Sequence, residues 1–408
     1  MAGAVWTGHV SLAFLWKSPI PPKIQVLERS GSGCNPESSL TKERLARLIG
    51  SHPFGSEELH AFQINNEAGE VLFVSTTLAP ELQKWVMAAL GRARVSSAAL
   101  VVLDPASGDV LTMASYTADQ KPVNLTLSSS FPAASLFKIV TAAAAVETAN
   151  LTSGSTLAYD GRKHTLYRKQ LMRDVQSGRH QVTLKDSFAK SINVVFGKLG
   201  AFTLGPKALE EFAQRFYFNQ PIRFEMPVET SRFSPPDKDY FHLAEIASGF
   251  NRTTMLSPLH GALLAAAVAN DGLIMEPTVV AEVFDQNNNI YYRHQPVSMG
   301  QVISAKTVIE LKKMMRATIT KGTGRPFFRD VRVHPVLSKL EIGGKSGSIN
   351  NSQGRKVDWF VSFALKEGSE KIALAAVVVH NRDKLGVRAQ SLVRDSIIHY
   401  FSPLVRSK

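Results

Sequence analysis

The spacing of apolar residues along the chain predicts one β-hairpin at each end of a large domain. Apolar runs over 98–103 and 110–116 are separated by Asp-Pro-Ala-Ser-Gly-Asp, a sequence that favours a tight turn. The runs over 359–365 and 372–379 flank Lys-Glu-Gly in the same way. Two strand pairs with helical segments between them predict an α+β fold, in which helices pack on the faces of an antiparallel sheet.

Between the two hairpins, the apolar positions follow helical spacing. Alanine, a strong helix former, dominates several of these stretches, and proline marks the start of two of them. The segment 188–196 is expected to pass from loop character into a helix. The other expected helices are one that starts close to Ser135, one over 258–270, one over 308–315 and a final amphipathic one over 389–400.

The chain before residue 96 is expected to hold smaller elements. These are a helix over 41–48 with Thr41 as its cap, strands over 61–64 and 71–74, and a helix over 80–90. We therefore divide the chain into an apolar N-terminus with a linker (1–40), a short lead-in (41–95) and a main domain (96–402).

The first sixteen residues carry no Lys, Arg, Asp or Glu, but Thr7, His9 and Ser11 interrupt their apolar pattern. A helix needs roughly 20 apolar residues to span a bilayer, and this segment also lacks the positive start of a secretion signal. A trimmed anchor, an uncleaved signal and an ordinary N-terminus therefore all stay open. Residues 18–40 are rich in Pro, Ser and Gly, which is typical of a linker.

The formal net charge of +13 favours anionic partners in general. The basic residues are mostly scattered singly, without an arginine-rich tail or an aromatic RNA-binding motif, so a nucleic-acid partner is not expected. The densest basic cluster is either a solvated face or a rim for an acidic ligand, and consists of Arg162, Lys163, Arg168, Lys169, Arg173 and Arg179. Cys34 is the single cysteine, which excludes an intramolecular disulfide and a thiolate metal cluster.

Ser135 and Lys138 form a candidate nucleophile and base. Three residues separate them at the start of the expected helix, so their side chains lie on one helical face. A serine hydroxyl becomes a strong nucleophile when a base takes its proton, and an uncharged lysine amine can do this. The positive end of the helix dipole also favours negative charge that develops near the serine. Alone, this pattern is a weak signal and favours a surface serine on an alanine-rich core helix.

Two further short motifs supply the remaining chemistry. Ser191-Ile192-Asn193 offers a hydroxyl that can relay a proton and an amide that can hold a peptide group. Lys345-Ser346-Gly347 offers a cation, a hydroxyl and a residue without a side chain, so that substrate can lie against the backbone. The three motifs in this order follow the S-x-x-K, S-x-N, K-[TS]-G pattern. Their joint occurrence makes coincidence improbable.

With these motifs the chain resembles the penicillin-binding protein family, specifically the transpeptidase domain of monofunctional peptidoglycan synthases. The similarity covers roughly residues 75 to 402. Further support comes from Thr76-Thr77-Leu78 with Leu82-Gln83, Val102-Leu103-Asp104-Pro105 with Ser107-Gly108, Lys321-Gly322-Thr323-Gly324 and Asp358-Trp359-Phe360. The resemblance implies a serine β-lactamase-like fold with an all-helical subdomain.

The resemblance also implies an acyl transfer through a serine ester, with no metal or cofactor. Ser135 would attack a D-Ala-D-Ala carbonyl with Lys138 as base, although the identity of that base is disputed in this chemistry. Ser191 would pass a proton to the leaving amine with help from Lys345, and Asn193 would bind Lys138 and the substrate amide. Lys345 and Ser346 would hold the terminal carboxylate, with Gly347 leaving room for the substrate. The backbone N–H groups of Ser135 and Ser348 would form the oxyanion hole.

The partners implied by the family are peptidoglycan stem peptides and β-lactams, with a membrane glycosyltransferase and other cell-wall synthesis proteins as further candidates. The implied location is extracytoplasmic, at the periplasmic face of the bacterial inner membrane, with the anchor left open. The stretch before residue 75 is shorter than the usual pedestal domain, and no glycosyltransferase domain is expected in it. The other departures are Ser346 in place of the commoner Thr, and Leu136 where a small polar residue is more usual.

Three alternatives share this scaffold. A serine β-lactamase of the oxacillin-hydrolysing type resembles the chain at Ser135-Leu136-Phe137-Lys138, but such enzymes usually carry Ser-x-Val where this chain has Asn193. A D,D-carboxypeptidase differs only in using water as the acceptor and stays open. A non-catalytic penicillin-binding sensor or scaffold is disfavoured, because every reactive group is present.

Overall fold

The computed structural model describes residues 40–50, 60–119, 123–171, 178–234, 239–368, 370–381 and 385–406. The apolar stretch 1–16, Cys34 and all but the last residue of the expected linker lie outside these residues. Within the described part of the chain, none of the helices combines the length and the apolar character that crossing a bilayer requires.

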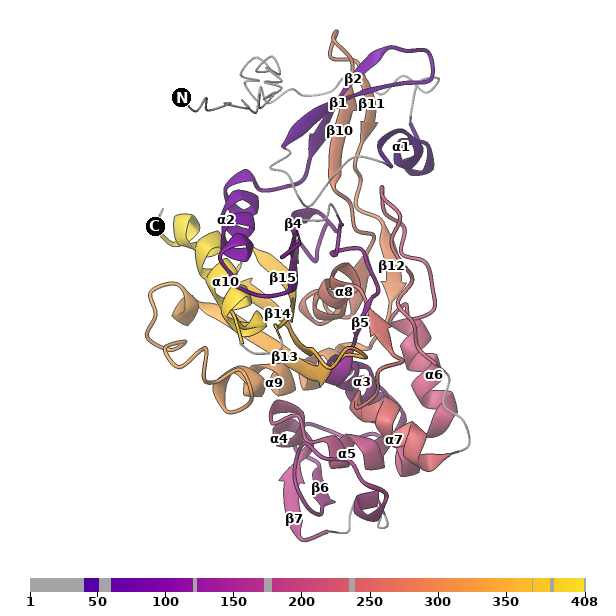
Figure 1. Ribbon diagram of the computed structural model, residues 1–408, viewed down its shortest axis with the longest axis vertical. Helices are drawn as coiled ribbons and strands as arrows, with labels where there is room; N and C mark the ends of the chain where they lie inside the picture. Colours follow the sequence, from indigo (N-terminus) through magenta and orange to yellow (C-terminus); the bar gives the residue numbers. More distant parts are fainter. Residues whose placement is uncertain are drawn as a thin grey trace, which may run out of the picture.

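A five-stranded antiparallel sheet forms the centre of the molecule (Figure 1). Its strands follow the order β13-β14-β15-β3-β4, so both expected hairpins are confirmed and lie side by side in one sheet. Strand β13 forms an outer edge and pairs with β14 along its whole length, from Leu340 opposite Lys366 to Asn350 opposite Lys356. The strands are β3 (Ser97–Leu103), β4 (Val110–Thr117), β13 (Leu340–Asn350), β14 (Lys356–Lys366) and β15 (Lys371–Val379).

Helices cover both faces of this sheet, which explains why its strands are apolar throughout. In β3, Ala99, Val101 and Leu103 face one core, while Ala98, Leu100 and Val102 face the other. Helix α8 (Pro258–Ala269) is buried over its whole length against the first face. The second face is covered by α2 (Pro80–Gly91) and α10 (Ala389–Arg406), as Figure 1 shows.

A mostly helical region lies below the sheet in Figure 1 and faces strand β13. The subdomain expected to be all-helical also contains a small antiparallel sheet, so that detail was wrong. Its elements are α3 (Lys138–Thr148), β6 (Thr156–Tyr159), the 3-10 helix η3 (Arg168–Leu171), β7 (His180–Thr183), α4 (Leu184–Ala189), α5 (Asn193–Lys198), the π-helix η4 (Leu199–Leu204), α6 (Gly205–Arg215) and α7 (Tyr240–Ser248).

Two helix predictions need correction. The expected loop at the start of 188–196 is wrong, because Phe188 and Ala189 end helix α4 and the chain turns only at 190–192 before α5 begins. Ser191 adopts a φ of 54° there, which breaks the helix between the two elements. The helix expected over 308–315 is longer than its apolar pattern and runs as α9 (Ala305–Thr320), with Ser304 as its cap.

A second sheet stands above the first one in Figure 1 and combines distant parts of the chain. The two expected strands of the lead-in are confirmed, and the second of them pairs with β10 from the middle of the chain. Its order is β1 (Ala61–Asn65), β2 (Val71–Thr76), β10 (Val280–Phe284) and β11 (Ile290–Arg293), and α1 (Lys42–Ile49) packs beside it with the expected Thr41 cap.

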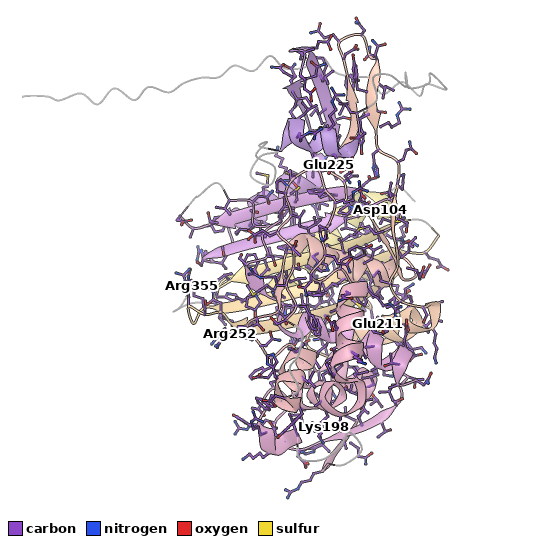
Figure 2. All side chains as sticks on the ribbon, turned by 90° about the vertical axis from the view of Figure 1, so that its right-hand side faces the viewer. Asp104, Lys198, Glu211, Glu225, Arg252 and Arg355 are labelled. Atoms are coloured by element: carbon purple, nitrogen blue, oxygen red, sulfur yellow. The ribbon has the colours of Figure 1, made fainter. Side chains whose placement is uncertain are left out.

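Buried charges join this second sheet to the rest of the molecule. Glu225, labelled in Figure 2 at the base of the sheet, accepts a hydrogen bond from the Val279 backbone N–H at 3.1 Å and one from the Thr278 hydroxyl. Lys42 lies 2.8 Å from a carboxylate oxygen of Glu276 and 3.6 Å from one of Glu225. The short remaining elements are β5 (Phe131–Pro132) with β8 (Met255–Leu256), β9 (Leu273–Met275) with β12 (Ser298–Gln301), and the 3-10 helix η5 (Leu337–Lys339).

Candidate active site

Ser135 lies in a short 3-10 helix, η2 (Ala134–Phe137), which leads directly into α3. The chain before it is held from two sides, because Trp359 Nε1 donates to the Pro132 carbonyl at 2.9 Å and the Ala133 N–H donates to the Thr254 carbonyl at 2.8 Å. Ser135 itself is half-buried. The nucleophile candidate is therefore presented from a fixed backbone, with part of its surface open.

Gly249 lies against this backbone and permits its path. A Cβ on Gly249 would come within 1.9 Å of the Ala134 carbonyl oxygen and 3.0 Å of the Ser135 nitrogen. Gly249 also has a φ of 66°, a conformation that glycine adopts with the least strain. Only a residue without a side chain fits at this point.

Lys138 is fully buried and its ammonium nitrogen meets three oxygens. Nζ lies 2.7 Å from Ser135 Oγ, 2.8 Å from Asn193 Oδ1 and 2.6 Å from the Ser248 carbonyl. Burial lowers the pKa of Lys138 well below its ordinary 10.5, and the positive charge of Lys345 lowers it further. A neutral amine keeps two N–H donors for the two carbonyl oxygens and turns its lone pair to the serine hydroxyl. This geometry suits a base for Ser135.

The second motif occupies the break between α4 and α5. The Asn193 N–H donates to the Lys163 carbonyl at 2.8 Å, and its Nδ2 donates to the His164 carbonyl at 3.0 Å. The His164 ring lies 3.3 Å from the Ser191 carbonyl, and burial holds the pKa of His164 below 6.5. The segment around His164 thus fixes Asn193 so that Oδ1 faces Lys138.

Lys345 is the second buried cation of the site. Its Nζ donates to Ser191 Oγ at 3.0 Å and to the Ser346 carbonyl at 2.9 Å. Burial lowers the pKa of Lys345 to about 7. The Ser346 hydroxyl lies 2.6 Å from Thr323 Oγ1, and the Thr323 N–H donates to the Ala189 carbonyl at 3.0 Å. Strand β13 and the end of α4 are therefore linked through Thr323.

Gly347 brings β13 close to the nucleophile. A Cβ on this glycine would lie 3.3 Å from the Ala134 Cβ and 3.4 Å from the Ala133 carbonyl oxygen. Ser348 follows on the same strand and is exposed. An extended peptide can add to such an edge strand through main-chain hydrogen bonds.

Two phenylalanines lie beside the lysine amines. Lys138 Nζ lies 5.7 Å from the centre of the Phe196 ring, and Lys345 Nζ lies 5.4 Å from that of Phe188. The two ring centres are 6.1 Å apart, and both side chains are buried. Both rings therefore form part of the buried surroundings of the two amines, and burial lowers the pKa of each lysine.

Hydrogen bonds within two groups join six of the eight residues expected from the motifs, and Gly347 and Ser348 follow on β13. The sequence reasoning missed His164, Ser248, Gly249 and the pair Phe188–Phe196. Ser248 acts through its backbone carbonyl, which leaves no signature in residue type. Thr323 lies within the stretch 321–324, which supports the family resemblance seen in the sequence. Its hydroxyl, which precedes the third motif, was the signal that could have identified it as a contact of Ser346.

Most described residues of the basic cluster are exposed, and Arg168 pairs with Asp239 at 3.0 Å. Arg173 lies outside the described residues. The choice between a solvated face and a rim for an acidic ligand stays open. In the described part of the chain, no three His, Cys, Asp or Glu side chains come together so that they could hold a metal ion.

This arrangement matches a known domain. The family model described as the penicillin binding protein transpeptidase domain covers residues 98–398. The chain belongs to this family. The resemblance read from the three motifs is thereby confirmed.

Named relatives are similar over most of the chain. The peptidoglycan D,D-transpeptidase PbpA of Mycobacterium tuberculosis is 25% identical over 364 residues, which cover 78% of this chain and 70% of the relative. The penicillin-binding protein PbpB of Mycolicibacterium smegmatis is 26% identical over 336 residues, covering 74% of this chain and 49% of the relative.

Solved structures share the fold. A crystal structure of PBPA from Mycobacterium tuberculosis superposes with a TM-score of 0.67 at 22% identity, covering 80% of this chain and 81% of that one. The D,D-transpeptidase domain of a peptidoglycan glycosyltransferase from Eggerthella lenta also gives 0.67, at 21% identity, with 85% and 96% covered. A penicillin G acyl-enzyme complex of the mycobacterial protein gives 0.64 at 21% identity, with 82% and 80% covered. The expected α+β fold is confirmed.

Proposed function

We propose that this protein is a serine-type peptidoglycan D,D-transpeptidase. One observation carries the proposal: the buried Lys138 amine, with its lowered pKa, lies 2.7 Å from the Ser135 hydroxyl. Membership of the transpeptidase family and the relatives named as D,D-transpeptidases support it.

In the first half-reaction Ser135 Oγ attacks the carbonyl carbon between the two terminal D-alanines of a stem peptide. Lys138 Nζ takes the hydroxyl proton as the C–O bond forms. The tetrahedral intermediate then breaks its C–N bond, and the leaving D-alanine nitrogen receives a proton. Ser191 relays the proton that Lys138 took, and a hydrogen bond from Lys345 Nζ to its hydroxyl supports this transfer. The product is an ester on Ser135 and free D-alanine.

The charged and polar side chains of the site indicate how the substrate binds. The terminal carboxylate of the donor peptide pairs with Lys345 and accepts a hydrogen bond from the Ser346 hydroxyl, which Thr323 orients. Asn193 Nδ2 donates one of its two N–H groups to His164, which leaves the other for the substrate amide. The backbone N–H groups of Ser135 and Ser348 stabilise the oxyanion, and the missing side chain of Gly347 lets the peptide approach β13.

In the second half-reaction an amine of a neighbouring stem peptide attacks the ester carbonyl. The amine loses a proton, the ester C–O bond breaks, and Ser135 recovers its hydroxyl as the new amide forms. We place this reaction outside the cytoplasm, at the membrane face where peptidoglycan is assembled. A glycan-polymerising enzyme is the partner that must supply the uncrosslinked strands, and β-lactams act as substrate mimics that acylate Ser135.

Covalent labelling with a fluorescent penicillin tests the proposal. The wild type should carry one adduct, with a mass increase equal to the intact penicillin, and Ser135→Ala should carry none. The matched control is Ser338→Ala, which removes an exposed serine remote from the motifs and should label like the wild type. An unlabelled wild type, or labelling that survives in Ser135→Ala, would refute the assignment.

Following the adduct over time separates the alternatives on the same scaffold. A transpeptidase keeps its adduct for many minutes, whereas sustained penicillin hydrolysis identifies a β-lactamase. Release of D-alanine from a stem peptide in the presence of an acceptor amine gives a cross-linked product for a transpeptidase. A shortened peptide alone identifies a carboxypeptidase.

A further inference from the structure

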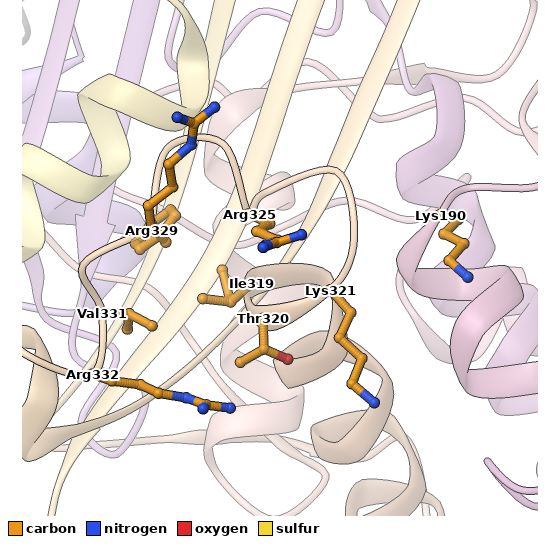
Figure 3. Close-up of a pocket in the computed structure, with 9 residues that line it drawn as sticks. Lys190, Ile319, Thr320, Lys321, Arg325, Arg329, Val331 and Arg332 are labelled. Carbon is orange, nitrogen blue, oxygen red and sulfur yellow. The ribbon is translucent and has the colours of Figure 1, made fainter.

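A cavity of about 550 Å³ lies where the end of α9 meets the end of α4. Figure 3 shows Lys190, the residue directly after α4, on one side, while the other labelled side chains come from the end of α9 and the loop after it. Its lining consists of Lys190, Ile319, Thr320, Lys321, Arg325, Phe328, Arg329, Val331 and Arg332. The volume is in the range of ligand-binding pockets.

The charge of this cavity is of one sign. Five of its nine lining residues are Lys or Arg, and none is acidic. Among the described residues, none of these five forms an ion pair, because the nearby carboxylates of Asp330 and Glu341 pair with Arg394 and Arg316 instead. Five cations without counter-charges raise the local potential and favour a ligand that carries several negative groups.

The cavity also has an apolar part and an extension. Ile319 and Phe328 are buried beneath the cations, with Val331 half-buried beside them. A second cavity of about 310 Å³ shares Ile319 and Arg332 with the first and continues to the start of strand β13. The space therefore suits an extended chain with carbon stretches between its charges better than a single small ion.

The cavity borders the same two segments that carry the catalytic groups. Lys190 directly precedes Ser191, and Lys321 lies two residues before Thr323, which hydrogen-bonds Ser346. We propose that this cavity binds carboxylates of an acidic stem peptide that lie away from the reacting bond. Because this deepens the proposed function, the cavity is a specificity site for peptides that carry free side-chain carboxylates.

Direct binding to the full chain tests this inference. A fluorescent peptide that ends in D-Ala-D-Ala and bears two free side-chain carboxylates is compared with the same peptide after amidation of both groups. Fluorescence anisotropy measures both affinities for the wild type and for Lys321→Glu combined with Arg325→Glu. The matched control is Lys84→Glu combined with Arg92→Glu, which makes the same charge change at exposed positions in α2 and directly after it.

We expect the cavity variant to bind the acidic peptide about tenfold more weakly, since each exposed charge pair contributes a modest factor. The amidated peptide should bind equally to all three proteins, and the control should match the wild type. If the double variant is unstable by thermal melting, Arg325→Gln should show a smaller loss of about two- to fivefold. An unchanged affinity, or an equal loss for both peptides, would overturn the inference.

Sodium tripolyphosphate serves as a competing anion. If it binds the wild type but not the cavity variant while the acidic peptide binds both equally, the cavity is a phosphate site and the peptide assignment is wrong. Acylation by fluorescent penicillin is measured on the same samples and should be unchanged in the cavity variant. Failure of acylation in the wild type would refute the proposed function, whereas the anisotropy comparison reports on the cavity alone.

Discussion

The two sides of the candidate active site each bury one lysine, but they use it differently. On the nucleophile side, Lys138 meets three oxygens and also experiences the positive charge of Lys345, which lowers its pKa well below 10.5. On the strand side, Lys345 meets two oxygens and burial alone lowers its pKa to about 7. The aromatic pair Phe188 and Phe196 lies beside both amines.

This difference shows how two lysines in one buried region can take two chemical roles, one as a base and the other as a binding site for a carboxylate. Burial makes the ammonium form costly on both sides, so two charged lysines cannot coexist there without a counter-charge. Repulsion between the two ammonium groups is mutual and favours the loss of one proton, and the lysine beside Ser135, whose pKa lies well below 10.5, is left as the base. The other, with a pKa of about 7, is protonated below neutral pH and can hold a carboxylate there. The four predictions below test this division, starting from the largest expected effect.

Replacing each lysine by methionine should separate the two roles. Lys138→Met removes the base and should lower the second-order rate constant of penicillin acylation between about 10² and 10⁴-fold. Lys345→Met removes one charge-assisted contact to the substrate carboxylate and should lower it by about 10- to 100-fold. Stopped-flow labelling measures both. Equal losses for the two variants would mean that the lysines do not have separate roles.

Gly249→Ala should disturb the nucleophile side alone. The added Cβ would lie 1.9 Å from the Ala134 carbonyl oxygen, so the backbone that carries Ser135 must move. A displacement of about 1 Å at a reacting group can cost about 10²-fold in rate, and we expect a loss of that size in acylation.

Gly69→Ala is the matched control for this substitution. Gly69 has a φ of 81°, but a Cβ there would meet no atom within 4 Å. The control should retain acylation, while its melting temperature falls by a similar amount because alanine is also strained at a positive φ. If Gly249→Ala acylates within about threefold of the wild type while its melting temperature falls, the contact does not position Ser135.

Sequence alone could predict the reactive groups because they are side chains of particular residue types that occur in short motifs with fixed spacing. It placed Ser135 beside Lys138 and anticipated both hairpins of the central sheet. It could not predict contacts made by the backbone or across long separations. The Ser248 carbonyl that accepts from Lys138 is such a contact, and so is the pairing of β2 with β10, roughly 200 residues apart along the chain. From sequence, Phe188 and Phe196 are indistinguishable from ordinary core residues. Only the structure shows that they lie beside both lysine amines.

The pH profile of the acylation rate should have a rising limb and a falling limb, each controlled by one of the two lysines. The base must be neutral, so the rate rises with pH through the lowered pKa of Lys138. Carboxylate binding needs the ammonium form of Lys345, so the rate falls above about pH 7, the pKa of Lys345 in the free protein. Far above that pH the rate constant should fall about tenfold per pH unit.

Variants assign the limbs of this profile. Lys345→Met should lose the falling limb, because no group remains whose deprotonation weakens carboxylate binding. His164 titrates on the acid side, with its pKa held below 6.5, and His164→Gln shows how much of the rising limb belongs to it. A falling limb that persists at the same pH in Lys345→Met would contradict the assignment.

The smallest effect is expected at Thr323, which acts on the strand side through another residue. Its hydroxyl lies 2.6 Å from Ser346 Oγ, and its backbone ties β13 to the end of α4. Thr323→Val keeps the shape and the backbone contact but removes the hydroxyl, and a neutral hydrogen bond contributes about 0.5–1.5 kcal/mol. The second-order rate constant of acylation should therefore fall by roughly two- to tenfold.

The loss should appear in the affinity for penicillin and leave the maximal acylation rate unchanged, because Thr323 orients a carboxylate-binding hydroxyl and does not touch the reacting bond. Thr323→Ser restores the hydroxyl and should recover the wild-type affinity, whereas a lowered maximal rate in the valine variant would connect Thr323 to the nucleophile side instead.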